Sequence, residues 1–338
     1  MGALPLSSVK LEDIANQLGL SISTVSRALS GNGRIGKETR ERVLAEVHKS
    51  DYTVNAVARS LRLRNARNIG IIVPDITNSF FASVIKSAQH VCRSNGYTLM
   101  VCNSDESAEY ETESLHSLLE KQISGLILSS VCSSDELMRH YESLNTPVVF
   151  IDNVPNECDK CNVVSIDNYA AARQITQALI DRGYTCIGMI SGPRSQSTGL
   201  LRYNGFCDAI SAANLPLRAE WIAEGDFKME SGYTCMKALL ALERRPRAMI
   251  FANNYIAYGA INAIRDCGLR IPSDIAVASF DAVDDTHLIT PLITSINQPA
   301  DQIGKCAAEI LFRRFASETK ELCENIVLQP SFINGQSW

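Results

Sequence analysis

The chain has 338 residues, of which 46% are hydrophobic, which suffices for two or more packed domains and excludes a disordered protein. No apolar run approaches the roughly 18 residues that a membrane helix needs, and residues 1–13 do not resemble a secretory signal, so we expect a cytoplasmic protein. Residues 1–68 carry 11 Lys and Arg against 6 Asp and Glu, whereas the other residues carry 21 against 31, so a polyanion partner is expected for the N-terminal segment alone.

Three short amphipathic helices are predicted in this basic segment. Apolar residues recur at helical spacing over residues 11–18, and Gly19 then stops the helix. Ser21 is a good N-cap for a second helix over residues 22–29, and a third follows over residues 37–50. Two helices joined by a glycine-containing turn above a third are typical of a helix-turn-helix, whose second helix enters the major groove of DNA. A small helical bundle without this function is the alternative.

The segment KLEDIANQLGLSISTVSRALSGNGRIGKETRERVLAEVHKSDYTVNAVARSLR resembles the DNA-binding head of the lactose/galactose-repressor family almost without gaps. The resemblance implies a head over residues 1–54. One departure is Gly36, where such heads usually place Ser at the cap of the third helix. The DNA contacts that the resemblance implies for the head are Ile22, Ser23, Thr24, Ser26, Arg27 and Arg34.

The resemblance also implies a hinge helix and linker over residues 55–68, one per subunit of a dimer, that enters the minor groove at the centre of a palindrome. The implied contacts of the hinge are Asn55, Ala58, Arg59 and Leu61. Leu61 would wedge between base pairs. A helix this short is marginal alone, so we expect it to order only on DNA. The alternative is a charged linker with Leu61 packed on the rest of the protein.

From Ile69 the chain alternates short apolar strands with amphipathic helices. The predicted strands are residues 69–75, 98–104, 125–131, 148–153, 186–192, 248–254 and 275–282, and the predicted helices include residues 80–94, 109–122, 170–182, 199–213 and 255–267. Such alternation predicts an α/β fold with parallel sheets covered on both faces. The length of this region favours two doubly wound subdomains, with residues 292–315 and 324–330 crossing between them.

This region also resembles the repressor family, and through it the periplasmic sugar-binding proteins, in motifs such as PDITNSFFA, DRGYTCIGMISGP, FANNYIAYGA and TSINQP. The resemblance implies a ligand-binding and dimerisation body over residues 69–338. Its N-subdomain would comprise about residues 69–166 and 299–325, and its C-subdomain about residues 167–298 and 326–338. Ligands of such folds bind between the subdomains, at the carboxyl ends of the strands.

The family motifs imply a ligand site at these strand ends. The implied site residues are Phe80, Phe81, Asp152, Thr198, Arg202, Phe227, Asn253, Asp281 and Gln298. Their chemistry suits a polyol, because carboxylates accept from hydroxyls, Arg donates a fork to a ring oxygen or carboxylate, and aromatic rings cover the apolar side of a sugar. A turn or helix-cap role is the alternative for each strand-end Asp or Asn. Asn254 departs from the family, which often has Asp there.

Enzyme classes find no support, since the chain lacks the GxSxG, HExxH, phosphate-loop and dinucleotide motifs. No cofactor and no metal are expected, because the close pair Cys158 and Cys161 has no second Cys or His pair nearby. We expect a dimeric repressor that binds a palindromic operator under the control of a sugar or sugar acid. A purine or nucleoside is the alternative effector. A stand-alone sugar-binding protein is the alternative of another class, but it would need an export signal and no basic head.

Overall fold

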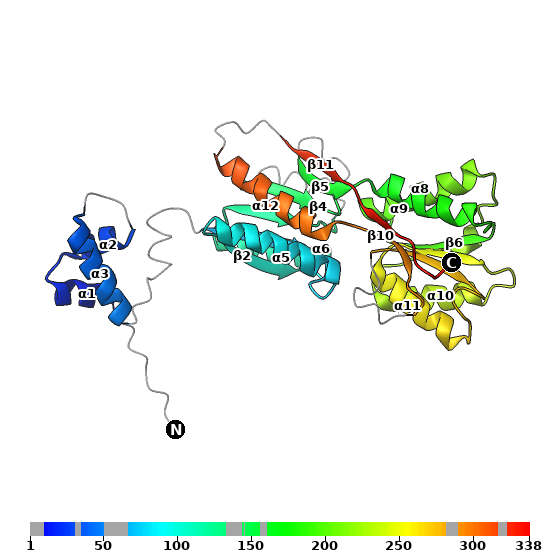
Figure 1. Cartoon of the computed structure of the whole chain (residues 1–338), viewed down its shortest axis with the longest axis horizontal. Helices are drawn as coiled ribbons and strands as arrows, with labels where there is room; N and C mark the ends of the chain where they lie inside the picture. The colour runs from blue at the N-terminus through cyan, green and yellow to red at the C-terminus, as the bar shows by residue number, and fades with distance from the viewer. Residues whose placement is uncertain are drawn as a thin grey trace, which may run out of the picture. The chain divides into compact units, whose positions relative to one another are not determined.

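The computed structural model describes residues 10–30, 35–50, 67–132, 144, 146–155, 161–281, 290–316 and 323–338. The chain forms two compact units, Met1–Ala66 and Arg67–Trp338, here called the head and the body (Figure 1).

The described residues of the head form three helices, α1 (Leu11–Leu18), α2 (Ile22–Ser30) and α3 (Lys37–Lys49). Gly19 ends α1 with φ 65°, a left-handed conformation that glycine adopts without steric cost. The Ser21 side-chain oxygen accepts from the Thr24 backbone N–H at 3.2 Å and so caps α2. The core of the head consists of Ile14, Ala15, Val25, Ala28 and Val43. The helix-turn-helix predicted from the apolar periodicity is confirmed.

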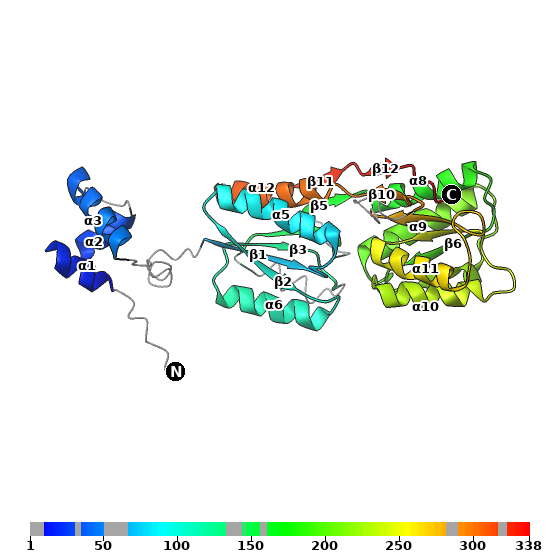
Figure 2. The ribbon, with the colours of Figure 1, turned by 60° about the horizontal axis from the view of Figure 1, so that its bottom comes forward.

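The first half of the body is a six-stranded parallel sheet with the strand order β11-β5-β4-β3-β1-β2. The strands are β1 (Asn68–Val73), β2 (Thr98–Asn103), β3 (Gly125–Leu128), β4 (Val148–Ile151), β5 (Asn162–Ile166) and β11 (Asn325–Leu328). Helices α5 (Ser79–Ser94) and α12 (Ala300–Ala316) cover one face, and α6 (Ala108–Glu120) covers the other (Figure 2). Burial on both faces explains the almost continuous apolar run of β1.

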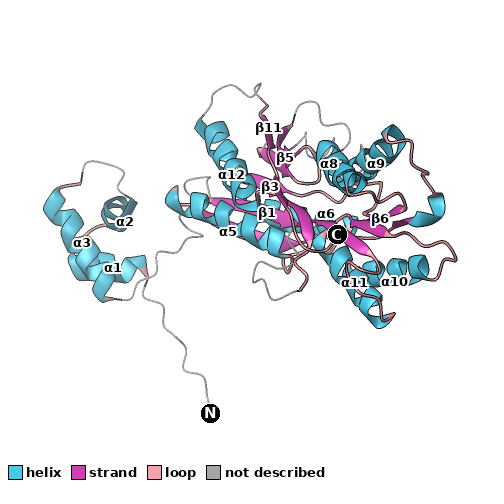
Figure 3. Cartoon of the chain, turned by 45° about the vertical axis from the view of Figure 1, so that its right-hand side comes forward, coloured by secondary structure: helices cyan, strands magenta, loops and turns pink. Residues whose placement is uncertain are grey.

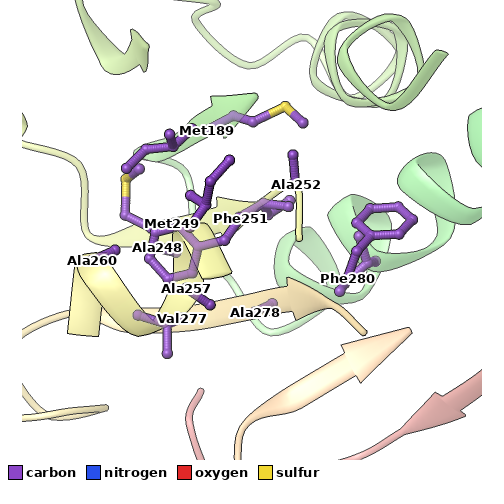
Figure 4. Close-up of a cluster of buried hydrophobic side chains, with 14 of the residues drawn as sticks. Met189, Ala248, Met249, Phe251, Ala252, Ala257, Ala260, Val277, Ala278 and Phe280 are labelled. Carbon is purple, nitrogen blue, oxygen red and sulfur yellow. The ribbon is translucent and has the colours of Figure 1, made fainter. Parts of the chain in front are cut away.

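The second half has the strand order β12-β10-β9-β8-β6-β7, in which only β12 is antiparallel to its neighbour. The strands are β6 (Ile187–Ser191), β7 (Ile222–Glu224), β8 (Ala248–Phe251), β9 (Ala276–Phe280), β10 (Thr294–Asn297) and β12 (Ser331–Ile333). The helix pair α8 (Asn168–Asp181) and α9 (Ser197–Ala212) lies opposite the pair α10 (Met229–Leu240) and α11 (Asn254–Asp266) across this sheet (Figure 2). Figure 4 shows part of the core between them, which includes Met249 and Phe251.

The chain crosses between the two sheets three times, after β5, after β10 and after β11 (Figure 3). Because β11 pairs with β5, the first sheet extends to Leu328, past the boundary expected near residue 325. The two doubly wound α/β halves predicted from the alternation of strands and helices are confirmed.

Candidate functional site

A cavity of about 250 Å³ lies between the two halves of the body. Its lining follows directly on strands of both sheets: Glu106 comes after β2, Asp152 after β4, Asn253 after β8, Asp281 after β9 and Gln298 after β10. Carboxyl ends of parallel strands are where open α/β sheets bind ligands. The structure brings all nine sequence-predicted ligand residues to this one cavity: Phe80, Phe81, Asp152, Thr198, Arg202, Phe227, Asn253, Asp281 and Gln298.

Arg202 is the buried cation of the cavity and projects from α9. Its Nε donates to Asn168 Oδ1 at 2.7 Å, its Nη1 donates to the Ala252 carbonyl, and its guanidinium lies 4.2 Å from the centre of the Phe280 ring. The remaining nitrogen, Nη2, lies 3.9 Å from Asp152 Oδ1, which is beyond hydrogen-bond distance. Arg202 is therefore fixed by two of its nitrogens and presents the third to the cavity.

Three buried polar atoms of the cavity have no hydrogen-bond partner in the described part of the chain. They are Asp152 Oδ1, Arg202 Nη2 and Gln298 Oε1. The Gln298 amide nitrogen is engaged, because it donates to Asp281 Oδ1 at 3.3 Å. Buried polar atoms in proteins are almost always paired, with protein groups, water or a ligand, so these three atoms are suited to bind polar groups in the cavity.

Burial alters the acidity of the carboxyl groups in the cavity. Burial raises the pKa of Asp281 to about 6, although the positive charge of Arg202 opposes this shift. Burial likewise raises the pKa of Glu106 to about 7, opposed by the hydrogen bond that its carboxylate accepts from Gln196 Nε2 at 3.0 Å. The pKa of Asp152 is also raised by burial. Perturbed acids in a concave site are typical of a functional site.

Backbone strain is also concentrated around the cavity. Of eight non-glycine residues with positive φ in the described part of the chain, five line it: Asp105, Glu106, Asp152, Phe227 and Asp281, with φ from 51° to 64°. Such residues are uncommon, and each costs on the order of 1–3 kcal/mol. The fold therefore holds these side chains in the cavity at the expense of local backbone energy.

Some of the predicted residues have structural roles as well. Asn253 caps α11, because its Oδ1 accepts from the Ile256 N–H at 2.8 Å, and its Nδ2 donates to the Phe227 carbonyl at 2.9 Å. The cap role that was the alternative for this residue is thus present, alongside its place in the cavity wall. The Phe227 ring packs directly on Gly192, where a Cβ atom would overlap the ring.

Hydrogen bonds join the two halves beside the cavity. Asn78 at the start of α5 and Asn254 at the start of α11 exchange two side-chain hydrogen bonds of 3.1 and 3.0 Å. Asn153 donates to Gln196 Oε1 at 2.9 Å on the other half. Asn254 does not line the cavity but bonds to Asn78 of the other half. The presence of Asn here, where the family often has Asp, therefore bears on the contact between the halves.

Sequence reasoning missed other residues of the lining. These are Pro74, Asp75, Asn78, Asp105, Glu106, Asn153, Gln196, Lys228, Met229 and Tyr255. Most lie in the same strand-end loops as the predicted residues. Treating each whole loop as a candidate would have found them.

In the head, α2 presents the side chains predicted to contact bases. Ile22 is 48% exposed, Ser23 and Arg27 are exposed, and Thr24 and Ser26 are half-buried. Arg34, Asn55, Ala58, Arg59 and Leu61 lie outside the described residues.

Within the described ranges, no three His, Cys, Asp or Glu side chains gather to hold a metal ion, and Cys161 is disulfide-bonded. No described helix has the length and apolar character needed to cross a membrane.

Two family models match the chain. The model of periplasmic binding proteins and the sugar-binding domain of the LacI family matches residues 66–333, and the model of the lacI family of bacterial regulatory proteins matches residues 10–55. The HTH-type transcriptional repressor PurR of Serratia proteamaculans (strain 568) is 34% identical over 328 residues, covering 97% of this chain and 96% of that protein.

Solved structures agree with the family models. The lac repressor dimer bound to operator and the anti-inducer ONPF aligns with a TM-score of 0.85 at 25% identity, covering 98% of this chain and 99% of that one. The complex of the transcriptional regulator CelR with cellobiose aligns with a TM-score of 0.74 at 26% identity, covering 98% and 100%. These proteins are transcription regulators, and none of the three is named as an enzyme. This chain is a ligand-responsive transcription regulator and belongs to the LacI family of bacterial regulatory proteins.

Proposed function

We propose that the protein is a cytoplasmic repressor that binds palindromic operator DNA as a homodimer, and that a small sugar or sugar acid in the body cavity sets its affinity for DNA. The observation that carries the effector site is the convergence of three unpaired buried polar atoms, from Asp152, Arg202 and Gln298, on one cavity. The dimer and the operator are supported by the lac repressor structure, which contains both.

The DNA contacts are proposed for α2 of the head and for the hinge. On α2, Ile22, Ser23 and Arg27 are exposed, while Thr24 and Ser26 are half-buried beside them. Arg27 is suited to guanine, whose O6 and N7 atoms accept two hydrogen bonds from a guanidinium. The roles of Arg34, Asn55, Ala58, Arg59 and Leu61 stay predictions from the family resemblance.

The aromatic side chains support a ring-shaped effector. Phe80 and Phe81 contact each other edge to face at 4.9 Å between centroids, and Phe227 lies in the same lining. Aromatic rings and carboxylates together favour a sugar, whose apolar faces and hydroxyls they match. A purine or nucleoside is a second candidate, because repressors named PurR are 32–34% identical to this chain. Aromatic walls also suit a planar base.

Thermal-shift screening with sugars, sugar acids, purines and nucleosides tests the proposal, since a ligand of the native cavity raises the melting temperature by mass action. Compounds that shift the melting temperature are then tested for their effect on operator affinity by fluorescence anisotropy. The variant Asp281→Ala should lose the ligand effect and keep ligand-free operator binding. Asp301→Asn, an exposed residue outside the cavity, is the control. A wild-type ligand response in Asp281→Ala would contradict the assignment of the cavity.

A further inference from the structure

A chain of hydrogen-bonded side chains crosses from one half of the body to the other beside the cavity. Gln196, just before α9, donates from Nε2 to Glu106 Oε2 at 3.0 Å and accepts from Asn153 Nδ2 at 2.9 Å. Glu106 and Asn153 belong to the half that contains β1, whereas Gln196 belongs to the half that contains β6. The carboxyl group of Glu106 is therefore bound to a partner on the opposite half.

Backbone N–H groups take part in the same junction. Asn153 Oδ1 accepts from the Thr198 N–H at 3.2 Å and from Ser197 Oγ at 2.8 Å. The Val154 N–H in turn donates to Ser197 Oγ at 2.9 Å. The amide protons of Thr198 and Val154 are thus held by bonds between the halves, and their exchange with solvent requires these bonds to open.

The loop that carries Glu106 is held against the opposite half at two consecutive residues. Asp105 and Glu106 both have left-handed backbone, with φ of 51° and 58°, which is uncommon outside glycine. Lys228, before α10 on the opposite half, donates from Nζ to the Asp105 carbonyl at 3.3 Å and lies 3.7 Å from Asp105 Oδ1. Contacts at both residues therefore place the Glu106 side chain between the halves.

The surroundings that the closed body gives Glu106 disfavour its charge. Burial raises the pKa of Glu106 to about 7, and the charges of Asp152 and Asp226 act in the same direction. The hydrogen bond from Gln196 and the charge of Lys228 oppose the shift. The other charged residues of the cavity lining are Asp75, Asp105, Arg202 and Asp281. Because much of this cover lies on the opposite half, separation of the halves returns the pKa of Glu106 towards its ordinary value of 4.5.

We propose that Glu106 is a proton-linked latch between the two halves of the body: its protonated carboxyl group favours closure on Gln196, and its ionisation favours separation of the halves. The closed body binds this proton more tightly than the open body, so closure is most favourable below pH 4.5 and weakens as the pH rises to about 7. Above that pH both forms are ionised and the effect levels off. Acidification therefore closes the body whichever effector the cavity takes.

Hydrogen exchange resolved to single amides tests the latch in the full-length, ligand-free protein at pH 5.5 and pH 7.5. After correction for the intrinsic pH dependence of exchange, protection of the Val154 and Thr198 amides should fall about tenfold between these two pH values. The Ile71 amide, inside β1, should exchange more slowly than both. Protection that does not change with pH overturns the inference. Exchange of Val154 and Thr198 as slow as that of Ile71 also overturns it, because the halves would then separate only when the body unfolds.

Two substitutions separate the charge of Glu106 from its hydrogen bond. Glu106→Gln keeps an acceptor for Gln196 and cannot ionise, so both amides should stay protected at both pH values. Glutamine fits this backbone, since Gln122 has φ 55° in the same protein. Glu106→Ala removes the acceptor and should lower protection at both pH values. Glu230→Gln, at an exposed position of α10, should keep the wild-type fall. A wild-type fall in Glu106→Gln would overturn the proton link, and full protection in Glu106→Ala would overturn the latch.

Discussion

In the head, the side chains proposed to read DNA lie on the exposed face of α2, whereas in the body the side chains proposed to bind the effector are largely buried at strand ends. The head keeps its core and its functional surface on separate faces of short helices. The body instead places charges and strained residues where its two halves meet. Substitutions on the exposed face of α2 should therefore change DNA binding without changing stability. Substitutions in the cavity should change both ligand binding and stability.

The largest effect is expected for Arg202→Met. It leaves the carboxyl groups of Asp152 and Asp281 buried without their cation, which typically costs about 3–5 kcal/mol. Urea unfolding of the body measures this loss, and ligand binding should disappear with it. Adding Asp281→Asn should recover part of the stability, since one buried charge is removed. Arg173→Met, at an exposed position of α8, is the control, and an equal loss in that variant would contradict the account.

Gly192→Ala should give the next largest effect. The added methyl overlaps the Phe227 ring, and overpacking typically costs about 1–3 kcal/mol. Displacing this ring should weaken ligand binding and spare the sequence preference of the head for DNA. Calorimetry with the ligand that gives the largest thermal shift and a thermal melt measure the two effects. Combination with Phe227→Leu should restore stability. Unchanged ligand affinity in Gly192→Ala would remove Phe227 from the ligand wall.

Arg27→Ala should affect DNA binding by the head without affecting the stability of the body. Because Arg27 is exposed on α2, its loss should cost about 1–3 kcal/mol of specific operator affinity and leave the unfolding of the body unchanged. Anisotropy with operator and with a scrambled duplex measures the ratio of specific to nonspecific affinity. If that ratio stays at its wild-type value, Arg27 does not read bases.

The sequence predicted the helices of the head more completely than the strands of the body. Helical periodicity located α1 within its observed bounds, because each helix turns one apolar stripe inward. Strand-helix alternation predicted the parallel sheets but not β5, β7 or β12, and it gave the segments that hold β10 and β11 only as crossings between the subdomains. Family motifs supplied the ligand residues. Hydrogen-bond partners could not be predicted, since Asn168 and Ala252 are far from Arg202 in sequence.

The smallest effect concerns pH. The pKa of Glu106 is raised from 4.5 to about 7, and that of Asp281 from 3.8 to about 6, so the folded body holds these protons more tightly than the unfolded chain. Their contribution to stability is therefore greatest at low pH and declines as pH rises through 6 and 7. Urea unfolding at pH 5 and pH 8 measures this decline, which should be smaller in Glu106→Gln. Glu230→Gln, at an exposed position, should behave as wild type.

A thermodynamic cycle tests the central claim, that a ligand of this cavity controls DNA binding. The compound with the largest thermal shift is used to measure operator affinity with and without ligand, and ligand affinity with and without saturating operator. The account predicts that ligand changes operator affinity by the same factor by which operator changes ligand affinity. In Arg27→Ala, ligand affinity without DNA should keep its wild-type value. A ligand that binds only in the cavity and leaves operator affinity unchanged would contradict the account.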